Sequence, residues 1–274
     1  PSSRLASSPW RTVLMISTAL LKWLRRRLAR LWIERLDNRH RYLLIMKNTI
    51  ASVLVSSITL IALASAGAAD TPANLLAIPG KVLYQNDLAG EVGAPLKVAK
   101  GKWEAVEGVL RGSEVAADDH AAVVKLAAPF KDAVFEYEVR FVGDAKSTSL
   151  SINDAKDHVC RVSLTPTSVT VQKDDHDHEG PDVAEVFHRL KADLKSGEWH
   201  KVRLEMVGSE MVGRCDDFVG FGSHDLIGTQ KASFGFTVSG ESVEFRNLRV
   251  YEAKPNPEWE SLKKKLIRKA ERGS

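Results

Sequence analysis

The segment FEYEVRF, residues 135–141, places Glu136, Glu138 and Arg140 at every second position. Residues two apart on a β-strand share one face, so the two carboxylates would point the same way. Carboxyl groups about 5–5.5 Å apart can act as nucleophile and acid in glycoside cleavage. The same pattern is typical of a solvated sheet face on which an arginine pairs across strands, and it favours this second interpretation.

Arg161, Trp199 and Arg203 are expected beside these carboxylates and Arg140 as contacts to a saccharide. Trp199 offers a flat ring on which a sugar could stack. The next residue, His200, shares its parity with the apolar residues of its segment, Val202, Leu204 and Met206. This alternation predicts that His200 faces the core, while Trp199 and Arg203 face outward.

The densest polar cluster is the segment KDDHDHEG at residues 173–180. Carboxylate oxygens suit Ca²⁺ and imidazoles suit Zn²⁺, so a divalent cation is a candidate ligand here. Its ligands would come from Asp174, Asp175, His176, Asp177, His178 and Glu179. The spacing matches neither an EF-hand nor an H-E-x-x-H site. The composition favours the alternative, a solvated insertion between strands.

Cys160 and Cys215 are the only cysteines in the chain. Neither belongs to a C-x-x-C or metal-ligand pattern. In an oxidising compartment the two could form a disulfide. A domain of about 200 residues can also build a sufficient core without one. Pairing and free thiols therefore both stay open.

Short alternating segments separated by turn residues run from Ile78 to Tyr251. Thr165-Pro166-Thr167 separates two of them and predicts a hairpin link. Trp103 begins another segment and is expected in the core, because its burial removes a large apolar area from water. We count roughly ten or more strands and no convincing helix, which predicts an all-β fold with a two-sheet jelly-roll sandwich over residues 70–253.

Residues 46–69 have the features of a bacterial export signal. Lys47 supplies a positive start, Ile50 to Leu63 form an apolar stretch, and Ala66-Gly67-Ala68 offers the small residues that a signal peptidase needs. We therefore expect an exported protein, periplasmic or extracellular, with no stable membrane span once the signal is cleaved. An uncleaved apolar stretch would act as an anchor, although its length is marginal for a span.

Residues 1–45 form a basic leader that contains Trp23 and Trp32 among several arginines. One interpretation is an amphipathic helix at a membrane surface. The other is upstream sequence joined through a misplaced start, with translation beginning at Met46. The complete signal after Met46 favours this second interpretation.

Charge separates the leader and signal from the rest of the chain. Residues 1–68 contain eleven Lys and Arg but two Asp and Glu, whereas residues 69–274 contain 28 and 33. The part expected to fold is therefore mildly acidic, although the whole chain carries a net charge of +4. This balance argues against a nucleic-acid partner, which requires a basic face that neutralises phosphates.

Residues 254–274 have a different pattern from the strands before them. Lys254-Pro255-Asn256-Pro257 ends the last strand, and the sequence that follows predicts a short basic helix. Trp259, Leu262 and Leu266 would form one apolar stripe on it. We expect this helix to dock lightly on the sandwich, with a role at a partner or envelope surface as the alternative.

Four segments follow one another in a recognisable order: WEAVEGVL at 103–110, FEYEVRF at 135–141, GEWH at 197–200, and GFTV with VEFRNLRV within 235–250. Together they resemble the 3-keto-disaccharide hydrolase family over about residues 80–252. The resemblance implies a concanavalin-like jelly-roll fold and a glycoside-hydrolysing activity.

Two hypotheses of function follow. The first is an exported domain that engages carbohydrate, with Glu136 or Glu138 as acid or base where hydrolysis takes place. The second is a non-catalytic sugar-binding, adhesion or scaffold module of the cell envelope. Turnover abolished by Glu138→Gln would support the enzyme, and binding without turnover would support the module.

Overall fold

Thirteen β-strands, two short 3₁₀ turns and one C-terminal α-helix make up the part of the chain that the structure describes. The computed structural model describes residues 73–90, 92–176 and 179–273, which all belong to one compact unit. The leader at 1–45 and the signal at 46–69 lie outside the described residues, so both stay predictions. No described helix combines the length and the apolar character that a membrane crossing requires.

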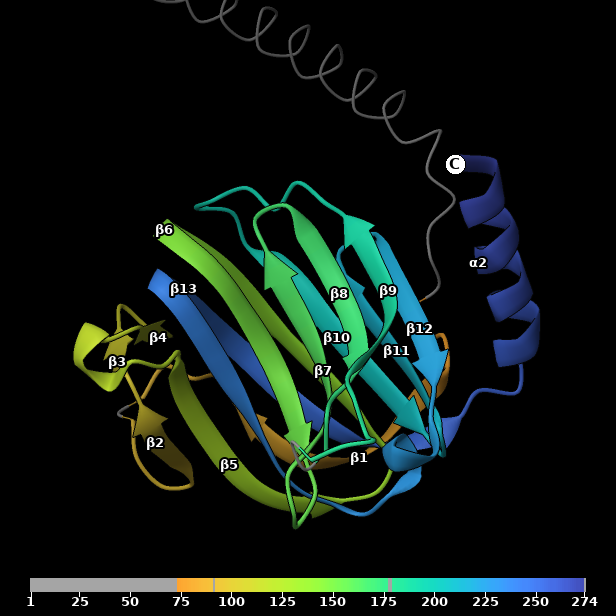
Figure 1. Ribbon diagram of the computed structural model, residues 1–274, viewed down its shortest axis with the longest axis horizontal. Coiled ribbons are helices and arrows are strands. Elements are labelled where there is room, and N and C mark those ends of the chain that lie inside the picture. The colour runs from red at the N-terminus through yellow and green to blue at the C-terminus, as the bar shows by residue number, and fades with distance from the viewer. Residues whose placement is uncertain (1–72, 91, 177–178, 274) are drawn as a thin grey trace, which may run out of the picture. The chain divides into compact units, whose positions relative to one another are not determined.

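Strands follow one another through most of the unit, and turns or loops connect them (Figure 1). In chain order the elements are β1 (Ala77–Asn86), β2 (Leu96–Lys100), β3 (Lys102–Val106), β4 (Val109–Ser113), η1 (Ala116–Asp118), β5 (Ala122–Phe130), β6 (Ala133–Asn153), β7 (His158–Thr165), β8 (Ser168–Lys173), β9 (Glu185–Lys191), β10 (His200–Val207), β11 (Glu210–Cys215), β12 (Phe218–Ser223), η2 (Asp225–Gly228), β13 (Lys231–Pro255) and α2 (Trp259–Gly273).

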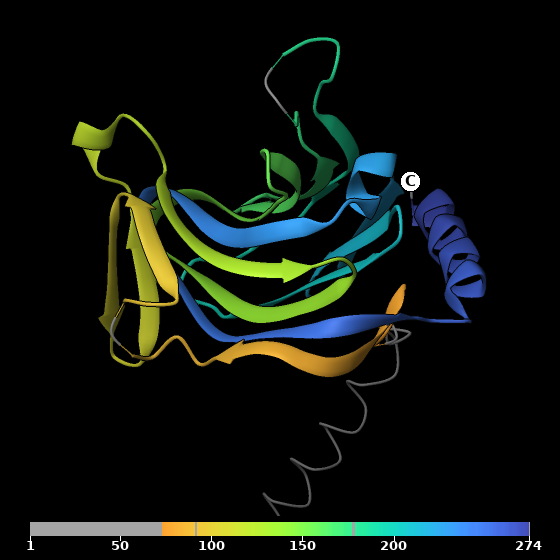
Figure 2. The same cartoon turned by 90° about the horizontal axis from the view of Figure 1, so that it is seen from below.

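Two long strands, β6 and β13, belong to two sheets at once. Residues 133–142 of β6 pair with β10 and with the last part of β13, whereas residues 145–153 pair with β7 and with the first part of β13. The first sheet has the order β12-β11-β10-β6-β13-β4-β3, with β1 also paired to β13. The second has the order β9-β8-β7-β6-β13-β5-β2. Figure 2 shows the two layers, and the predicted sandwich is confirmed.

Both long strands bend where they pass from one sheet to the other. Gly143 and Gly240 have φ values of +59° and +87° there, in the left-handed region that glycine adopts without a steric penalty. A Cβ at Gly240 would lie 2.7 Å from the carbonyl oxygen of Asp144. The Asp144 backbone N–H also donates to Glu241 Oε2 at 2.8 Å. The bend therefore depends on glycine.

Aromatic rings from both sheets fill the space between the layers. The ring centroids of Phe135 and Phe234 lie 5.0 Å apart, and those of Phe236 and Phe245 lie 4.4 Å apart. Trp103 is buried and stacks on Phe245 at 5.9 Å, so its predicted core position is confirmed. Burial of such large rings between sheets supplies much of the apolar stabilisation of the sandwich.

Both cysteines are buried free thiols. The Cys160 thiol donates toward the thioether sulfur of Met206 at 3.8 Å. Burial raises the pKa of Cys160 to about 12, with the charge of Asp174 acting in the same direction. Burial likewise raises the pKa of Cys215. The core therefore contains two unreactive thiols. Of the two alternatives, a disulfide and free thiols, the structure has free thiols.

Part of the outer face of the first sheet is covered by other segments of the chain. The helix α2 and the residues just before β1 pack there around a small second core. Its buried residues are Leu75, Leu76, Val212, Trp259 and Leu262, with Leu266 partly buried beside them. The apolar stripe and the docking predicted for the helix are therefore confirmed. In the described part of the chain, no helix covers the outer face of the second sheet.

Candidate functional site

The residues predicted to contact a saccharide lie on two different faces of the sandwich. Five of them share the outer face of the first sheet: Glu136, Glu138, Arg140, Trp199 and Arg203. Arg161 instead lies on β7, which belongs to the second sheet. The expectation of a single face is corrected, because β6 bends between the segment that carries the glutamates and the segment that pairs with Arg161.

The two predicted catalytic carboxylates already have arginine partners. Glu136 forms an ion pair with Arg203, whose Nε also donates to Glu205 Oε1 at 2.7 Å. Glu138 accepts a hydrogen bond of 2.6 Å from Arg246 Nε. This is the cross-strand pairing that the sequence pattern favoured over catalysis. The catalytic role of Glu136 and Glu138 stays a prediction.

Trp199 is engaged by cations from two neighbouring strands. The guanidinium carbons of Arg140 and Arg246 lie 4.6 and 4.0 Å from its ring centroid. Arg140 Nε in turn donates to the buried Glu244 at 2.6 Å. Cation–π contacts of this kind hold the ring against the sheet. His200, on the opposite side of the strand, is buried as predicted, and its Nδ1 lies 2.7 Å from Asp216 Oδ2.

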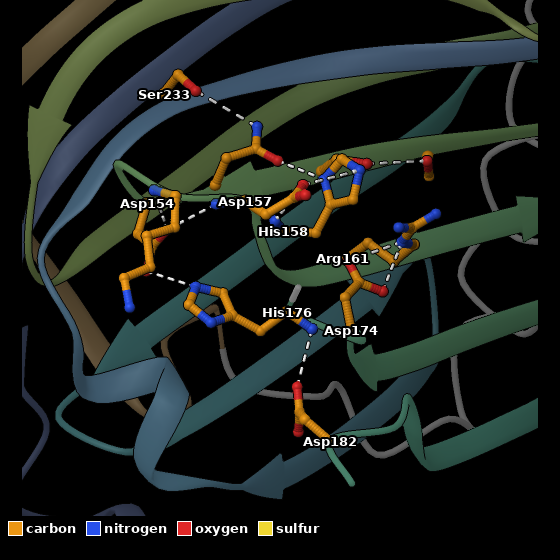
Figure 3. A network of polar contacts seen from close by, with 12 residues as sticks. Asp154, Asp157, His158, Arg161, Asp174, His176, Asp182 and Ser233 are labelled. Carbon is orange, nitrogen blue, oxygen red and sulfur yellow. Dashed lines mark hydrogen bonds and ion pairs between the residues drawn. The ribbon is translucent and has the colours of Figure 1, made fainter. Parts of the chain in front are cut away.

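Described residues of the predicted metal segment take part in a hydrogen-bonded network (Figure 3). Buried Asp174 accepts from Arg161 Nε at 2.7 and 2.8 Å and from Gln172 Nε2 at 2.9 Å. His176 Nε2 lies 2.8 Å from Asp154 Oδ2, and the His176 backbone N–H donates to Asp182.

The other predicted ligands add no cluster within the described residues. Asp175 is half-buried, Glu179 is exposed, and Asp177 and His178 lie outside the described residues. Among the residues whose placement is described, no group of three His, Cys, Asp or Glu side chains could hold a metal ion. Binding of Ca²⁺ or Zn²⁺ by this segment stays a prediction.

A groove of about 530 Å³ lies on the outer face of the second sheet. Hydroxyl and amide side chains form much of its floor: Ser147, Ser149, Ser151, Asn153, Ser163 and Thr237. Basic side chains are also part of the lining: Lys100, His120, Lys125, His158 and Arg161. Among the described residues that line it, none has a carboxylate and none has a phenyl, phenol or indole ring.

Strand periodicity explains why the groove floor is polar. In β6, Leu150 and Ile152 face the core. The residues that alternate with them, Ser149, Ser151 and Asn153, therefore face the groove. The Ser149 hydroxyl lies 2.6 Å from that of Thr237 and 3.3 Å from that of Ser151. Sequence reasoning missed these residues. The signal that could have found them is the alternation of small hydroxyl residues through 147–153.

His158 and Arg161 form the basic end of the groove. His158 Nδ1 lies 2.6 Å from Asn153 Oδ1. Burial lowers the pKa of His158, and the charges of Arg161 and Lys125 add to this, while Asp157 and Asp174 oppose it. The groove therefore disfavours the charged form of this imidazole. Buried Asp174 holds the Arg161 guanidinium in place through its Nε.

Comparison with solved structures supports the sandwich. One similar structure is the CBM2 module of the evolved Dit of Lactobacillus casei BL23 phage J-1, with a TM-score of 0.51 and 9% identity over 64% of this chain and 97% of that chain. Another is the laminarinase from Rhodothermus marinus, with a TM-score of 0.51 and 10% identity over 65% of this chain and 99% of that chain. No family model and no curated protein matches. The chain thus has an all-β, concanavalin-like jelly-roll fold.

Proposed function

We propose that this protein is an exported carbohydrate-binding domain that holds a saccharide in the groove of the second sheet. The observation that carries the proposal is the floor of hydroxyl and amide groups within a groove of about 530 Å³. Small-molecule sites are concave, have volumes of about 300–1,000 Å³, and use a few placed polar groups for orientation. Serine, threonine and asparagine can both donate to and accept from sugar hydroxyls.

The distribution of carboxylates favours binding over hydrolysis in this groove. Glycosidases of the common type flank the scissile bond with two carboxyl groups. None of the described residues that line the groove supplies one, and Glu136 and Glu138 lie on the other sheet in pairs with arginines. Glycoside hydrolysis is the second candidate, because four segments resemble the 3-keto-disaccharide hydrolase family. The spacing of Glu136 and Glu138 on one strand face makes either of them the candidate acid or base.

A glycan array probed with the purified protein tests the proposal. Ser163 is a half-buried groove residue, so Ser163→Trp should fill the groove and abolish binding. Lys201→Trp is the matched control, because Lys201 is exposed on the outer face of the first sheet. Circular dichroism confirms that both variants fold. The proposal fails if no saccharide binds, or if folded Ser163→Trp binds as the wild type does.

The same samples distinguish the second candidate. Turnover of 3-keto-glycosides that is lost in Glu138→Gln would favour the hydrolase. Binding that survives in Glu138→Gln without any turnover would favour the binding domain.

Export is a separate part of the proposal and rests on the signal at 46–69. N-terminal sequencing of the native protein should find a mature start just after Ala68. A mature start before residue 60 would overturn it.

A further inference from the structure

Three lysines of the groove and its rim carry positive charges that no described carboxylate pairs with. Lys97 on β2 pairs in register with Lys125 on β5, so their side chains lie on the same face of the sheet. Lys100, at the end of β2, also lines the groove. Among the described residues, none of these three ammonium groups has a hydrogen-bond or ion-pair partner. Like charges directly opposite each other repel, and the repulsion lowers stability. A bound anion would relieve this repulsion.

Arg161 adds an oriented cation at the other side of the groove. Its Nε is held by both carboxylate oxygens of Asp174 (Figure 3). The Asp174 side chain is 2% exposed, whereas the Arg161 side chain is 29% exposed. No hydrogen bond in the described part of the chain occupies its two terminal nitrogens. A guanidinium fixed in this way presents a donor pair that matches the geometry of carboxylate or sulfate.

Overall composition does not explain this concentration of positive charge. Residues 69–274 contain more Asp and Glu than Lys and Arg, at 33 against 28. The groove reverses this balance, because its described lining has two lysines and one arginine but no acid. The described lining also contains no Phe, Tyr or Trp ring that could stack on a neutral sugar. Affinity must therefore come mainly from hydrogen bonds and charge.

We infer that the groove selects an anionic saccharide, one whose rings carry carboxylate or sulfate groups. This inference rests on the proposed function, since it names the class of saccharide held in the same groove. The serine and threonine hydroxyls would bind the sugar hydroxyls, while Lys125 and Arg161 would bind the anionic substituents.

Matched pairs of oligosaccharides test the inference by titration calorimetry. One pair is a galacturonate oligomer and its methyl ester, and the other is a sulfated oligomer and its desulfated form. In low salt, the charged member of at least one pair should bind at least about five-fold more tightly than its neutral partner. This factor corresponds to the energy of one ion contact at about 4 Å in water. The preference should disappear in about 1 M salt, where the Debye length is about 3 Å. The two pairs distinguish carboxylate from sulfate.

Variants locate the effect in the groove. Lys97→Gln/Lys125→Gln should remove most of the preference for the charged member, and Lys125→Arg should keep it. Lys201→Gln, on the first sheet, is the matched control and should bind as the wild type does. Equal binding of both members of each pair, or a preference that survives in the double glutamine variant, would overturn the inference but not the proposed function. Absence of binding to every saccharide would overturn the proposed function itself.

Discussion

Arg203 connects the first sheet to the segment that covers it, and we expect its removal to lower the stability of the protein. Its Nε donates to Glu205, and one terminal nitrogen donates to Asn74 Oδ1 at 2.8 Å. Glu205 in turn accepts the backbone N–H groups of Leu75 and Ala77, at 3.2 and 2.7 Å. The variant Arg203→Met keeps an unbranched apolar stem but removes the guanidinium with its charge and its hydrogen bonds.

The size of the loss follows from burial. The Arg203 and Glu205 side chains are 8% and 2% exposed. Removing one partner of a buried ion pair costs about 3–5 kcal/mol, because the other charge stays desolvated. Glu205 would still accept the two backbone N–H groups, so we expect the lower end, about 3 kcal/mol. A domain of this size loses about 2–4 °C of Tm per kcal/mol, which corresponds to about 6–12 °C.

Calorimetric melting and urea unfolding measure this loss, and Lys102→Met is the control. Lys102 pairs with Glu104 at 2.8 Å, with side chains 62% and 39% exposed. Exposed pairs contribute about 0–1 kcal/mol, so the control should melt close to the wild type. If Arg203→Met melts as Lys102→Met does, the burial argument is refuted. Faster hydrogen exchange at Leu75 and Ala77 in Arg203→Met would show that the covering segment has loosened.

Three further predictions concern the core, the groove and the bend. Cys160 and Cys215 are buried with raised pKa values, so a disulfide-exchange reagent should label neither in the native protein and both in urea; rapid native labelling would contradict this. His158 has a lowered pKa, so the unfolded chain binds more protons and stability should fall as the pH drops from about 7 to about 5. Urea melts should show a smaller fall for His158→Gln, and an equal fall would count against the assignment. Gly240→Ala should destabilise the protein by about 1–3 kcal/mol, because φ is +87° and the new Cβ would meet the Asp144 carbonyl oxygen; a melting curve like that of the wild type would refute the role of this bend.

Local alternation predicted most of the strands correctly. Phe135 and Tyr137 face the core and Glu136 and Glu138 face outward, as a period of two requires. The hairpin link between β7 and β8 forms where Thr165-Pro166-Thr167 predicted it, and Thr165 pairs with Ser168. These features depend on residues close together in the chain, so their pattern is visible without the fold.

The groove depended on contacts that a local pattern does not contain. Ser151 and Arg161 lie opposite each other on β6 and β7, yet their neighbours across the groove come from β5 and β13. The second pairing of β6 begins only after its bend at Gly143. The strand pattern does not reveal this bend, so it predicts the glutamates and Arg161 on a single face.

By itself, the sequence determined that the chain forms strands with one apolar and one polar side, because that periodicity is a property of each strand alone. Only the tertiary structure decided which polar side stays open. Glu205 binds the backbone of Leu75, 130 residues away in the chain, and Trp259 packs on Val212, so the first sheet is partly covered. These long-range contacts leave the groove of the second sheet as the open polar surface among the described residues, because none of its lining residues belongs to the covering segments.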